Sequence, residues 1–561
     1  MRKLTRKGTD PAQEPADVTD GLEPKEPEDL PLETVRATTG PKMVPLPHEY
    51  LAIQPGLAEN EAYLREAFTN STDIVFREFY MDQIRCMAIW VDGLINNRVS
   101  HDLFRALMID VHAQQIAGIP AEDRIEYTNL HLLPFYATIK IQDLAEAKRW
   151  IMMAKMMLFI DGSPFGLVLD AEATPMRSIS EPIVESSVYG PKDAFVESLR
   201  INTALIRSRL GDPELKSENY ILGRRSNTLV TLMFIDGLAR PEILQEVRRR
   251  LSRIDIDAVI DSAYLKELIV DRKYYVFPIM KATERPDKVV ADLLEGRFVL
   301  IVDGSPIVLT APTLLMEFFQ AAEDYYNNPV TTTFIRLLRY GGFILSTTLL
   351  GFFVAITTFH QEMIPIPLVF GIAGTRESVP FPAVVEAITM LIPLELLWEA
   401  GIRLPRIVGG AVSIVGALIL GQAAVQAGFV SPAMVIVVAL TAIANFVLGS
   451  GYELANAIRL IRITTLLGGA AFGLYGLTLV LLAWLAHLGS LTSFKVPYMA
   501  LVPIVEPKGM WDMIFRAPRW DMNRRPEVLV ETERLRDNTP PPEPLSGTLQ
   551  DYENPQNREG Q

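Results

Sequence analysis

The sequence predicts an α/β cytosolic region of two related subdomains, followed by an α-helical multi-span membrane domain, with disordered tails at both ends. Residues 341–505 hold only 12 charged residues in 165, whereas 21% of the whole chain is charged. The first 330 residues instead alternate apolar β-branched runs with stretches of helical periodicity, which is typical of a soluble α/β fold. Because a helix needs about 20 apolar residues to cross a bilayer core, we expect the second half of the chain to lie in a membrane.

Composition narrows the class of protein further. The net charge of −14 argues against nucleic acid as a partner, because phosphate binding needs clustered cations. The single cysteine, Cys86, lies in an apolar run, which favours a buried structural thiol. We see no His/Cys cluster with metal-ligand spacing, so no metal or cofactor is expected. The basic start MRKLTRKGTD has no apolar segment behind it, so we expect no secretory signal and a soluble region that stays in the cytosol.

Shifts in composition divide the chain into five parts. Residues 1–48 carry eight prolines and many acids, which predicts a disordered tail because so little apolar surface can be buried. The Pro-rich end of the chain, from residue 526 onward, has the same character. The expected parts are a disordered tail at 1–48, cytosolic α/β subdomains at 58–185 and 195–320, a transmembrane helical domain at 330–505, and a basic, Pro-rich, partly disordered tail of cytosolic type at 506–561.

An internal echo suggests that the two subdomains are related. Four apolar runs end in Asp-Gly, and the aspartates are Asp92, Asp161, Asp236 and Asp303. The first pair is separated by 69 residues and the second pair by 67, counted from these positions. Each run predicts a strand followed by a tight turn. A ligand site at Asp-Gly is possible, but a turn that needs a glycine with positive φ is much the stronger interpretation.

The membrane half contains several uncharged segments. Runs of spanning length lie at 341–359, 407–430, 431–452 and 463–486. Residues 363–375 are also uncharged but too short to span, and two prolines favour a re-entrant or interfacial piece.

Residues 380–401 are apolar but carry Glu386, Glu395 and Glu399. Carboxylates at membrane depth are costly and usually face a bundle interior or an aqueous path. Glu395 and Glu399 share a helix face, whereas Glu386 lies on roughly the opposite side unless Pro393 kinks the helix. Two interpretations stay open with similar weight, a helix that lines an ion path and an amphipathic helix at the membrane interface.

Small and amide side chains mark the run at 407–430. Gly409, Gly416 and Gly421 are candidates for close helix packing or gating. Gln422 and Gln426 are four residues apart and can line a hydrophilic path or bond between helices, of which packing is the stronger interpretation.

The positive-inside rule leaves the topology unsettled. Arg336 and Arg339, before the first apolar run, favour a cytosolic soluble region. If 380–401 spans, the arginine pairs near 405 and 460 are cytosolic but the basic tail is outside. If 380–401 does not span, the tail is inside and both arginine pairs are outside. A re-entrant segment at 489–505 is one way to reconcile these charges.

Long segments of the chain resemble one known family. In the soluble region they are GPKDAFVESLRINTALIRSRL (190–210), GRRSNT (223–228), EVRRRLSRIDID (246–257), TERPDKV (283–289) and LLEGRFVLIVDGSP (293–306). In the membrane region they are FFQAAEDYY (318–326), AITTFHQEMIP (355–365), ESVPFPAVVEA (377–387), EAGIRLPR (399–406), AVSIVGALILGQAAVQAGFVSPAMVIVVALTAIANF (411–446) and VPYMALVP (496–503). On these segments, within 58–520, the chain resembles the A subunit of the GerA-family nutrient germinant receptors of spore-forming Firmicutes. Gly410, Gln426 and the link 447–453 depart from the family pattern, which puts a polar pore ring at 426 in doubt.

The resemblance implies a role in spore germination. Family A subunits work in the inner membrane of the dormant spore, with a permease-like, nutrient-binding B subunit and a lipoprotein C subunit. The resemblance implies a homo-oligomer, a pentamer, that acts as a nutrient-gated channel for monovalent cations. In such a channel the acidic residues Glu386, Glu395 and Glu399 would attract cations.

Other functions stay open at this point. The chain can instead be a non-conducting scaffold that clusters receptors, like the GerA-like protein encoded in the SpoVA operon. A secondary transporter is weaker, since no membrane repeat is detectable. An enzyme is weaker still, because no nucleophile set, phosphate loop or metal motif is present.

Overall fold

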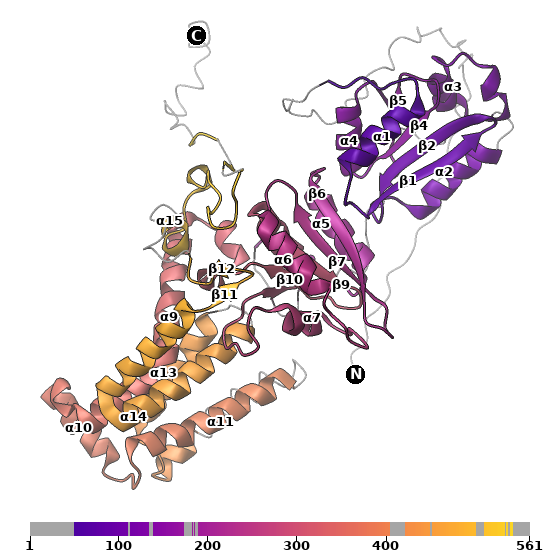
Figure 1. The fold of residues 1–561 in the computed structure, drawn as a ribbon. Coiled ribbons are helices and arrows are strands. Elements are labelled where there is room, and N and C mark those ends of the chain that lie inside the picture. Colours follow the sequence, from indigo (N-terminus) through magenta and orange to yellow (C-terminus); the bar gives the residue numbers. More distant parts are fainter. Residues whose placement is uncertain are drawn as a thin grey trace, which may run out of the picture. The chain divides into compact units, whose positions relative to one another are not determined.

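Figure 1 shows a computed structural model of the chain. It describes residues 50–109, 113–133, 138–172, 182, 185, 189–403, 421–448, 452–500, 510–532, 535–536 and 539–541. The tail expected at 1–48 and the candidate residues Gly409 and Gly416 lie outside the described residues.

The first sheet has the strand order β1-β2-β4-β5-β3, with antiparallel neighbours throughout. Helix α2 covers one face, and α1 and α4 cover the other (Figure 1), so all five side chains of β4 are buried. We call this unit, residues 50–172, subdomain 1. Its strands are β1 Ile74–Met81, β2 Ile84–Val91, β3 Thr138–Ile141, β4 Met156–Ile160 and β5 Gly166–Leu169. Its helices are α1 Leu57–Ala67, α2 Asn97–Ile109, the 3-10 helix η1 Ala113–Gly118, α3 Arg124–His131 and α4 Leu144–Met152.

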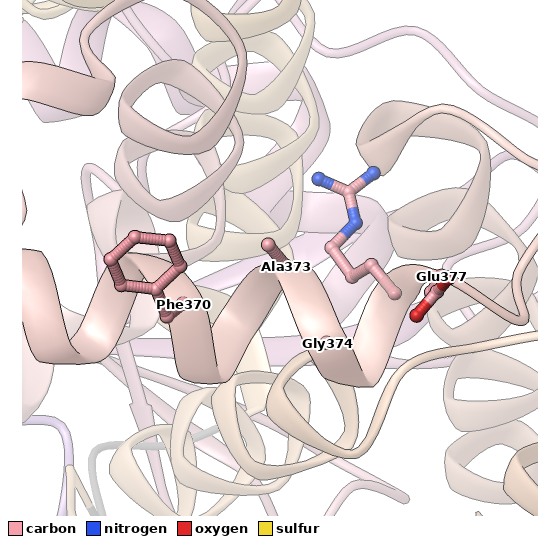
Figure 2. Close-up of a pocket in the computed structure, with 5 residues that line it drawn as sticks. Phe370, Ala373, Gly374 and Glu377 are labelled. Atoms are coloured by element: carbon pink, nitrogen blue, oxygen red, sulfur yellow. The ribbon is translucent and has the colours of Figure 1, made fainter.

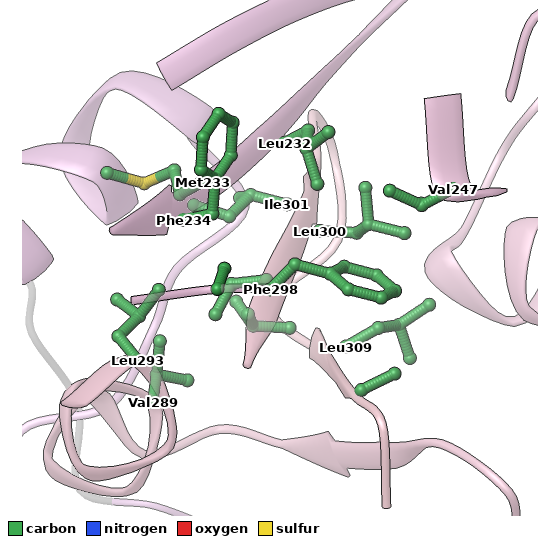
Figure 3. Packing of buried hydrophobic residues seen from close by; sticks show 14 of the residues in the cluster. Leu232, Met233, Phe234, Val247, Val289, Leu293, Phe298, Leu300, Ile301 and Leu309 are labelled. Atoms are coloured by element: carbon green, nitrogen blue, oxygen red, sulfur yellow. The ribbon is translucent and has the colours of Figure 1, made fainter. Parts of the chain in front are cut away.

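The second sheet repeats this order as β6-β7-β9-β10-β8, again antiparallel. We call this unit, residues 189–320, subdomain 2. Figure 3 shows its core, where Val247 of α6 lies beside Leu300 while Val289 and Leu293 of α8 lie at the other end of the group. Its strands are β6 Leu215–Leu222, β7 Thr228–Ile235, β8 Lys281–Thr283, β9 Phe298–Val302 and β10 Val308–Ala311. Its helices are α5 Leu199–Arg209, α6 Pro241–Leu251, α7 Ser262–Ile269 and α8 Pro286–Leu294.

The internal echo occupies matching positions in the two sheets. The four Asp-Gly pairs follow β2, β4, β7 and β9, and their glycines have φ between 76° and 88°. Two of the aspartates also bind a helix N-terminus. The Leu57 amide donates to Asp161 at 3.0 Å, and the Leu199 amide donates to Asp303 at 3.1 Å. These carboxylates therefore cap α1 and α5, a structural use that the turn pattern alone did not reveal.

The chain after α14 returns to subdomain 2. Phe494, Val496, Leu529 and Val530 are all buried in its core. The disorder expected from residue 526 onward is therefore wrong at Leu529 and Val530, because these apolar side chains are buried in a core. The elements after α14 are β11 Thr492–Ser493, β12 Val496–Pro497, α15 Met510–Ile514 and the 3-10 helix η5 Arg519–Asp521.

The region from residue 329 to residue 489 is helical in its described parts. Among the described residues, two helical stretches, Pro329–Phe359 and Leu454–Gly489, are long and apolar enough to cross a membrane by length and composition when each is counted as one helix. The two 3-10 helices η2 Leu315–Phe319 and η3 Ala322–Tyr325 lead into it from subdomain 2. Its elements are α9 Pro329–Phe359, the 3-10 helix η4 Gln361–Met363, α10 Ile366–Arg376, α11 Ala383–Arg403, α13 Pro432–Val447 and α14 Tyr452–Gly489.

Helix α14 is two helices that fold back on each other. The helical backbone breaks at Phe472 and Gly473, where Gly473 has φ of 61°. The Trp484 indole donates to the Thr464 hydroxyl at 2.9 Å, although 20 residues of unbroken helix would separate them by about 30 Å. The uninterrupted span expected at 463–486 is therefore wrong, because the chain reverses within it.

The first half of α14 runs parallel to α9. The Thr465 hydroxyl donates to the Thr347 carbonyl at 2.6 Å, and the reversal at Gly473 meets His360 just beyond the end of α9. We call the end of the bundle where α9 begins the base, and the end where α9 stops the far end. Both the start and the finish of α14 thus lie at the base.

Helices α11 and α13 run the opposite way. Glu386 near the start of α11 contacts Ser431 at the start of α13, whereas Trp398 stacks on Phe446 near their ends. Ala444, near the end of α13, touches Gly342 in the first half of α9, whereas Met434, near the start of α13, packs with Val354 farther along α9. Both helices therefore run from the far end to the base.

Candidate functional site in the helical bundle

Glu386 is completely buried at the far end. One carboxylate oxygen pairs with the Arg376 guanidinium at 3.1 Å. The other accepts from the Ser431 amide at 2.9 Å and from its hydroxyl at 2.8 Å. This carboxylate thus ties α10, α11 and the start of α13 together, and its charge is balanced inside one chain.

Glu395 lies toward the base, where α11 faces α14. Its two oxygens meet Arg462 at 2.6 Å and Arg459 at 3.1 Å. Arg459 also lies over the Trp398 ring, with 5.0 Å to the centroid. Arg459 and Arg462, which the sequence analysis used to judge the membrane topology, therefore also balance the charge of the predicted site residue Glu395.

The remaining polar candidates are at least partly exposed. Glu399 is half-buried one turn beyond Glu395, while Gln422 and Gln426 are both exposed on the helical residues 421–426. Gly421 is buried, and a Cβ there would meet Val435 at an ordinary 3.6 Å. The structure thus brings Glu395 and Glu399 together but leaves Glu386 at the other end of the bundle. Among the described residues, no helix covers the side chains of Gln422 and Gln426.

Within the described residues, the tightest helix packing occurs at glycines that were not among the candidates. A Cβ on Gly469 would meet the Gly351 carbonyl at 2.5 Å, and one on Gly476 would meet the Gly468 carbonyl at 2.1 Å. Such contacts let helix backbones approach directly, as small residues do in membrane bundles. Gly351 joins α9 to α14, while Gly468 and Gly476 join the two arms of α14.

A buried charge cluster at the base was not predicted. Asp324, 2% exposed, binds Arg336 at 2.9 Å and Arg339 at 2.8 Å, and its backbone carbonyl accepts from Arg516 at 3.2 Å. Asp512 also contacts Arg336, and burial raises the pKa of its carboxyl above the usual range. The two arginines expected ahead of the first span are therefore inside α9, where they bind the segment before it and the chain after α14.

Other possible sites are weaker. The described residues contain no group of three or more His, Cys, Asp or Glu side chains placed to hold a metal. An open cavity of about 630 Å³ runs along α10, with Phe370, Ala373 and Gly374 followed by Glu377 (Figure 2). Its lining comes from this one helix and the residue after it, so it offers no convergent polar groups for a ligand.

Known proteins match most of the chain. Spore germination protein KA of Bacillus subtilis is 42% identical over 509 residues, covering 89% of this chain and 91% of that protein. An uncharacterized membrane protein of the same bacterium, YfkQ, is 38% identical, with 84% and 91% covered. Spore germination protein GerLA of Bacillus cereus is 34% identical, with 85% and 96% covered.

Among solved structures, the chain is similar to the crystal structure of the N-terminal domain of the A subunit of the Bacillus megaterium spore germinant receptor GerK3. The identity is 30%, the TM-score is 0.39, and the match covers 48% of this chain and 99% of that one. The model of the family described as Bacillus/Clostridium GerA spore germination protein matches residues 62–528. The chain therefore belongs to the GerA family of spore germination proteins.

Proposed function

We propose that this chain is the A subunit of a nutrient germinant receptor in the spore inner membrane, where copies of it assemble, as a pentamer, into a nutrient-gated channel for monovalent cations. The soluble region lies in the cytosol, and the permease-like B subunit and the lipoprotein C subunit are its partners. Opening of the channel would release cations and commit the spore to germinate.

One observation carries the proposal of a path between copies. Glu386 and Glu395 are balanced by arginines within a single chain, whereas Gln422 and Gln426 point outward from a largely apolar segment. Exposed amides are costly against lipid but suit a water-filled path or a contact with a second copy. We call the surface formed by Gln422 and Gln426 the glutamine face. This face, together with Glu399 near the base, is therefore our candidate lining of the ion path. Gly421, beside Gln422, is where the helix can pack or hinge.

The test is potassium efflux from cells that express this chain with its B and C partners, on addition of amino acids, sugars and nucleosides. We expect nutrient-dependent efflux that falls at least tenfold in Gln422→Leu/Gln426→Leu and in Glu399→Gln complexes that still assemble. Gln361→Leu is the matched control, because Gln361 is an exposed glutamine outside the glutamine face. No efflux from an assembled complex that binds nutrient would contradict the channel.

A second candidate is the non-conducting scaffold. It is favoured by the same ion pairs, since Glu386 and Glu395 have arginine partners that leave little of their charge for cations. In that case the glutamine substitutions would weaken clustering of receptors without changing any ion flux.

A further inference from the structure

Helix α7 of subdomain 2 presents an apolar stripe to the outside. Tyr264 and Leu268 lie one turn apart on α7 and are 44% and 47% exposed, and Ile260, two residues before the helix, is 68% exposed. Tyr274, just beyond the helix, is 81% exposed. Four large apolar or aromatic side chains exposed along one short segment are unusual on a soluble surface and indicate a contact.

This stripe is separate from the core face of the same helix. Leu265 and Ile269 are fully buried in subdomain 2, on the side of α7 opposite Tyr264. The helix is therefore apolar on two faces, and only one of them is used within the described chain.

The segment after α7 is fastened to the end of the membrane hairpin. The Arg272 guanidinium donates to the Ser490 carbonyl at 2.6 Å, and the Thr492 hydroxyl donates to Asp271, also at 2.6 Å. Ser490 directly follows Gly489, the last residue of α14. Leu268 is therefore four residues, and Tyr274 two residues, from Arg272, which bonds to the point where the chain leaves the bundle at its base.

The chemistry of this edge suits a lipid surface. Arg272 and Lys273 directly precede Tyr274 in the chain, and Lys273 lies 5.4 Å from the centre of the Tyr274 ring. Tyrosine and basic residues concentrate at membrane interfaces, where the rings reach the headgroup level and the cations meet anionic lipid. Glu267 is the one acid exposed on the outward face of α7.

We infer that the stripe of Ile260, Tyr264, Leu268 and Tyr274 rests on the cytosolic leaflet of the membrane. The inference rests on the proposed function insofar as that function puts α14 in the bilayer. Contact with anionic headgroups at Lys273 and burial of the stripe would hold subdomain 2 against the membrane. Subdomain 2 could then move only along the membrane surface, together with the base of the bundle.

The test uses the full chain in lipid nanodiscs, with single cysteines carrying an environment-sensitive fluorophore in a Cys86→Ala background. Leu268→Cys reports on the stripe, and Ile221→Cys is the control because it is an equally apolar position, 70% exposed, on strand β6 of the same subdomain. With lipids that carry a nitroxide quencher on the headgroup, we expect at least twofold quenching at Leu268→Cys and none at Ile221→Cys. Replacing phosphatidylglycerol by phosphatidylcholine should weaken the quenching at Leu268→Cys.

A third label separates the two hypotheses. Leu479→Cys lies on an exposed position of α14 and should be quenched by nitroxides placed in the acyl chains if the bundle is in the bilayer. Quenching at Leu479→Cys with none at Leu268→Cys would overturn the lipid contact alone, and no quenching at Leu479→Cys would overturn the membrane placement itself. Crosslinking of Leu268→Cys to a second copy, without lipid quenching, would assign the stripe to a contact between copies instead.

Discussion

Glu386 illustrates what a single residue can and cannot reveal in the sequence. Its carboxylate in an apolar run predicts a functional or paired group, because an isolated charge there is too costly. Its partners, Arg376 and Ser431, are 10 and 45 residues away, and no local pattern specifies them. A sequence therefore identifies such an acid as special without separating an ion path from a structural ion pair.

The ion pair of Glu386 gives a direct prediction. Glu386→Gln leaves Arg376 without its counter-charge and should destabilise the folded chain by about 3–5 kcal/mol, because a charge in a buried pair loses its partner. The measurement is the midpoint of thermal unfolding in nanodiscs. Glu377→Gln, an exposed carboxylate one residue from Arg376, is the control and should change little. Equal loss in both variants would contradict the structural role of Glu386.

At the scale of elements, the reversal of α14 is the main difference from expectation. Small side chains in a membrane run suit either packing between two spans or a tight hairpin, and the structure uses Gly468 and Gly476 to bring the two arms of α14 together. Composition alone cannot separate these uses, since both need small side chains. The conflict of charges under the positive-inside rule was the available signal, and the structure has a reversal at Gly473.

Strands and turns were the most predictable elements. The four Asp-Gly pairs follow strands β2, β4, β7 and β9, as the alternation of apolar runs and turn residues predicts. Their pairing into two sheets of one order depends on contacts far apart in the chain, such as Cys86 opposite Ile160, which periodicity does not contain.

The close approach of Gly468 and Gly476 within α14 can be tested by adding a single methyl group. Gly476→Ala puts a methyl group where the Gly468 carbonyl already lies, so the arms must separate at a cost of about 1–3 kcal/mol. Gly341→Ala in α9 is the matched control, because nothing lies within 4 Å of a Cβ there. Thermal unfolding of both variants in nanodiscs measures the difference. A Gly476→Ala protein as stable as Gly341→Ala would rule out the tight hairpin.

At the scale of the whole molecule, the segment after α14 joins the bundle to the soluble region. Arg516 binds the backbone beside the Asp324 cluster, and Leu529 is buried in the core of subdomain 2. This long-range return could not be predicted, because the segment resembles a solvated tail in composition. It gives the soluble region a second connection to the base of the bundle, besides the direct one into α9.

Because of this connection, we expect alanine substitution of two nearby leucines to affect stability unequally. Leu529→Ala removes a fully buried side chain and should cost about 2–5 kcal/mol of stability in the soluble region. Leu535→Ala, where the leucine is 73% exposed, should cost little. Hydrogen exchange of subdomain 2 in the full chain measures both. Unchanged protection in Leu529→Ala would mean that this segment does not belong to the core.

The direction of the chain through the bundle underlies every functional assignment made above, and sided cysteine labelling tests it most directly. Native Cys86 is buried, and burial raises the pKa of its thiol to about 12, so it should stay unlabelled at neutral pH. In intact cells, an impermeant thiol reagent should label Met363→Cys and Tyr475→Cys at the far end. It should label Ile221→Cys and Leu535→Cys only after permeabilisation. Labelling of Leu535→Cys in intact cells, with Tyr475→Cys protected, would contradict the hairpin and return α14 to a single span.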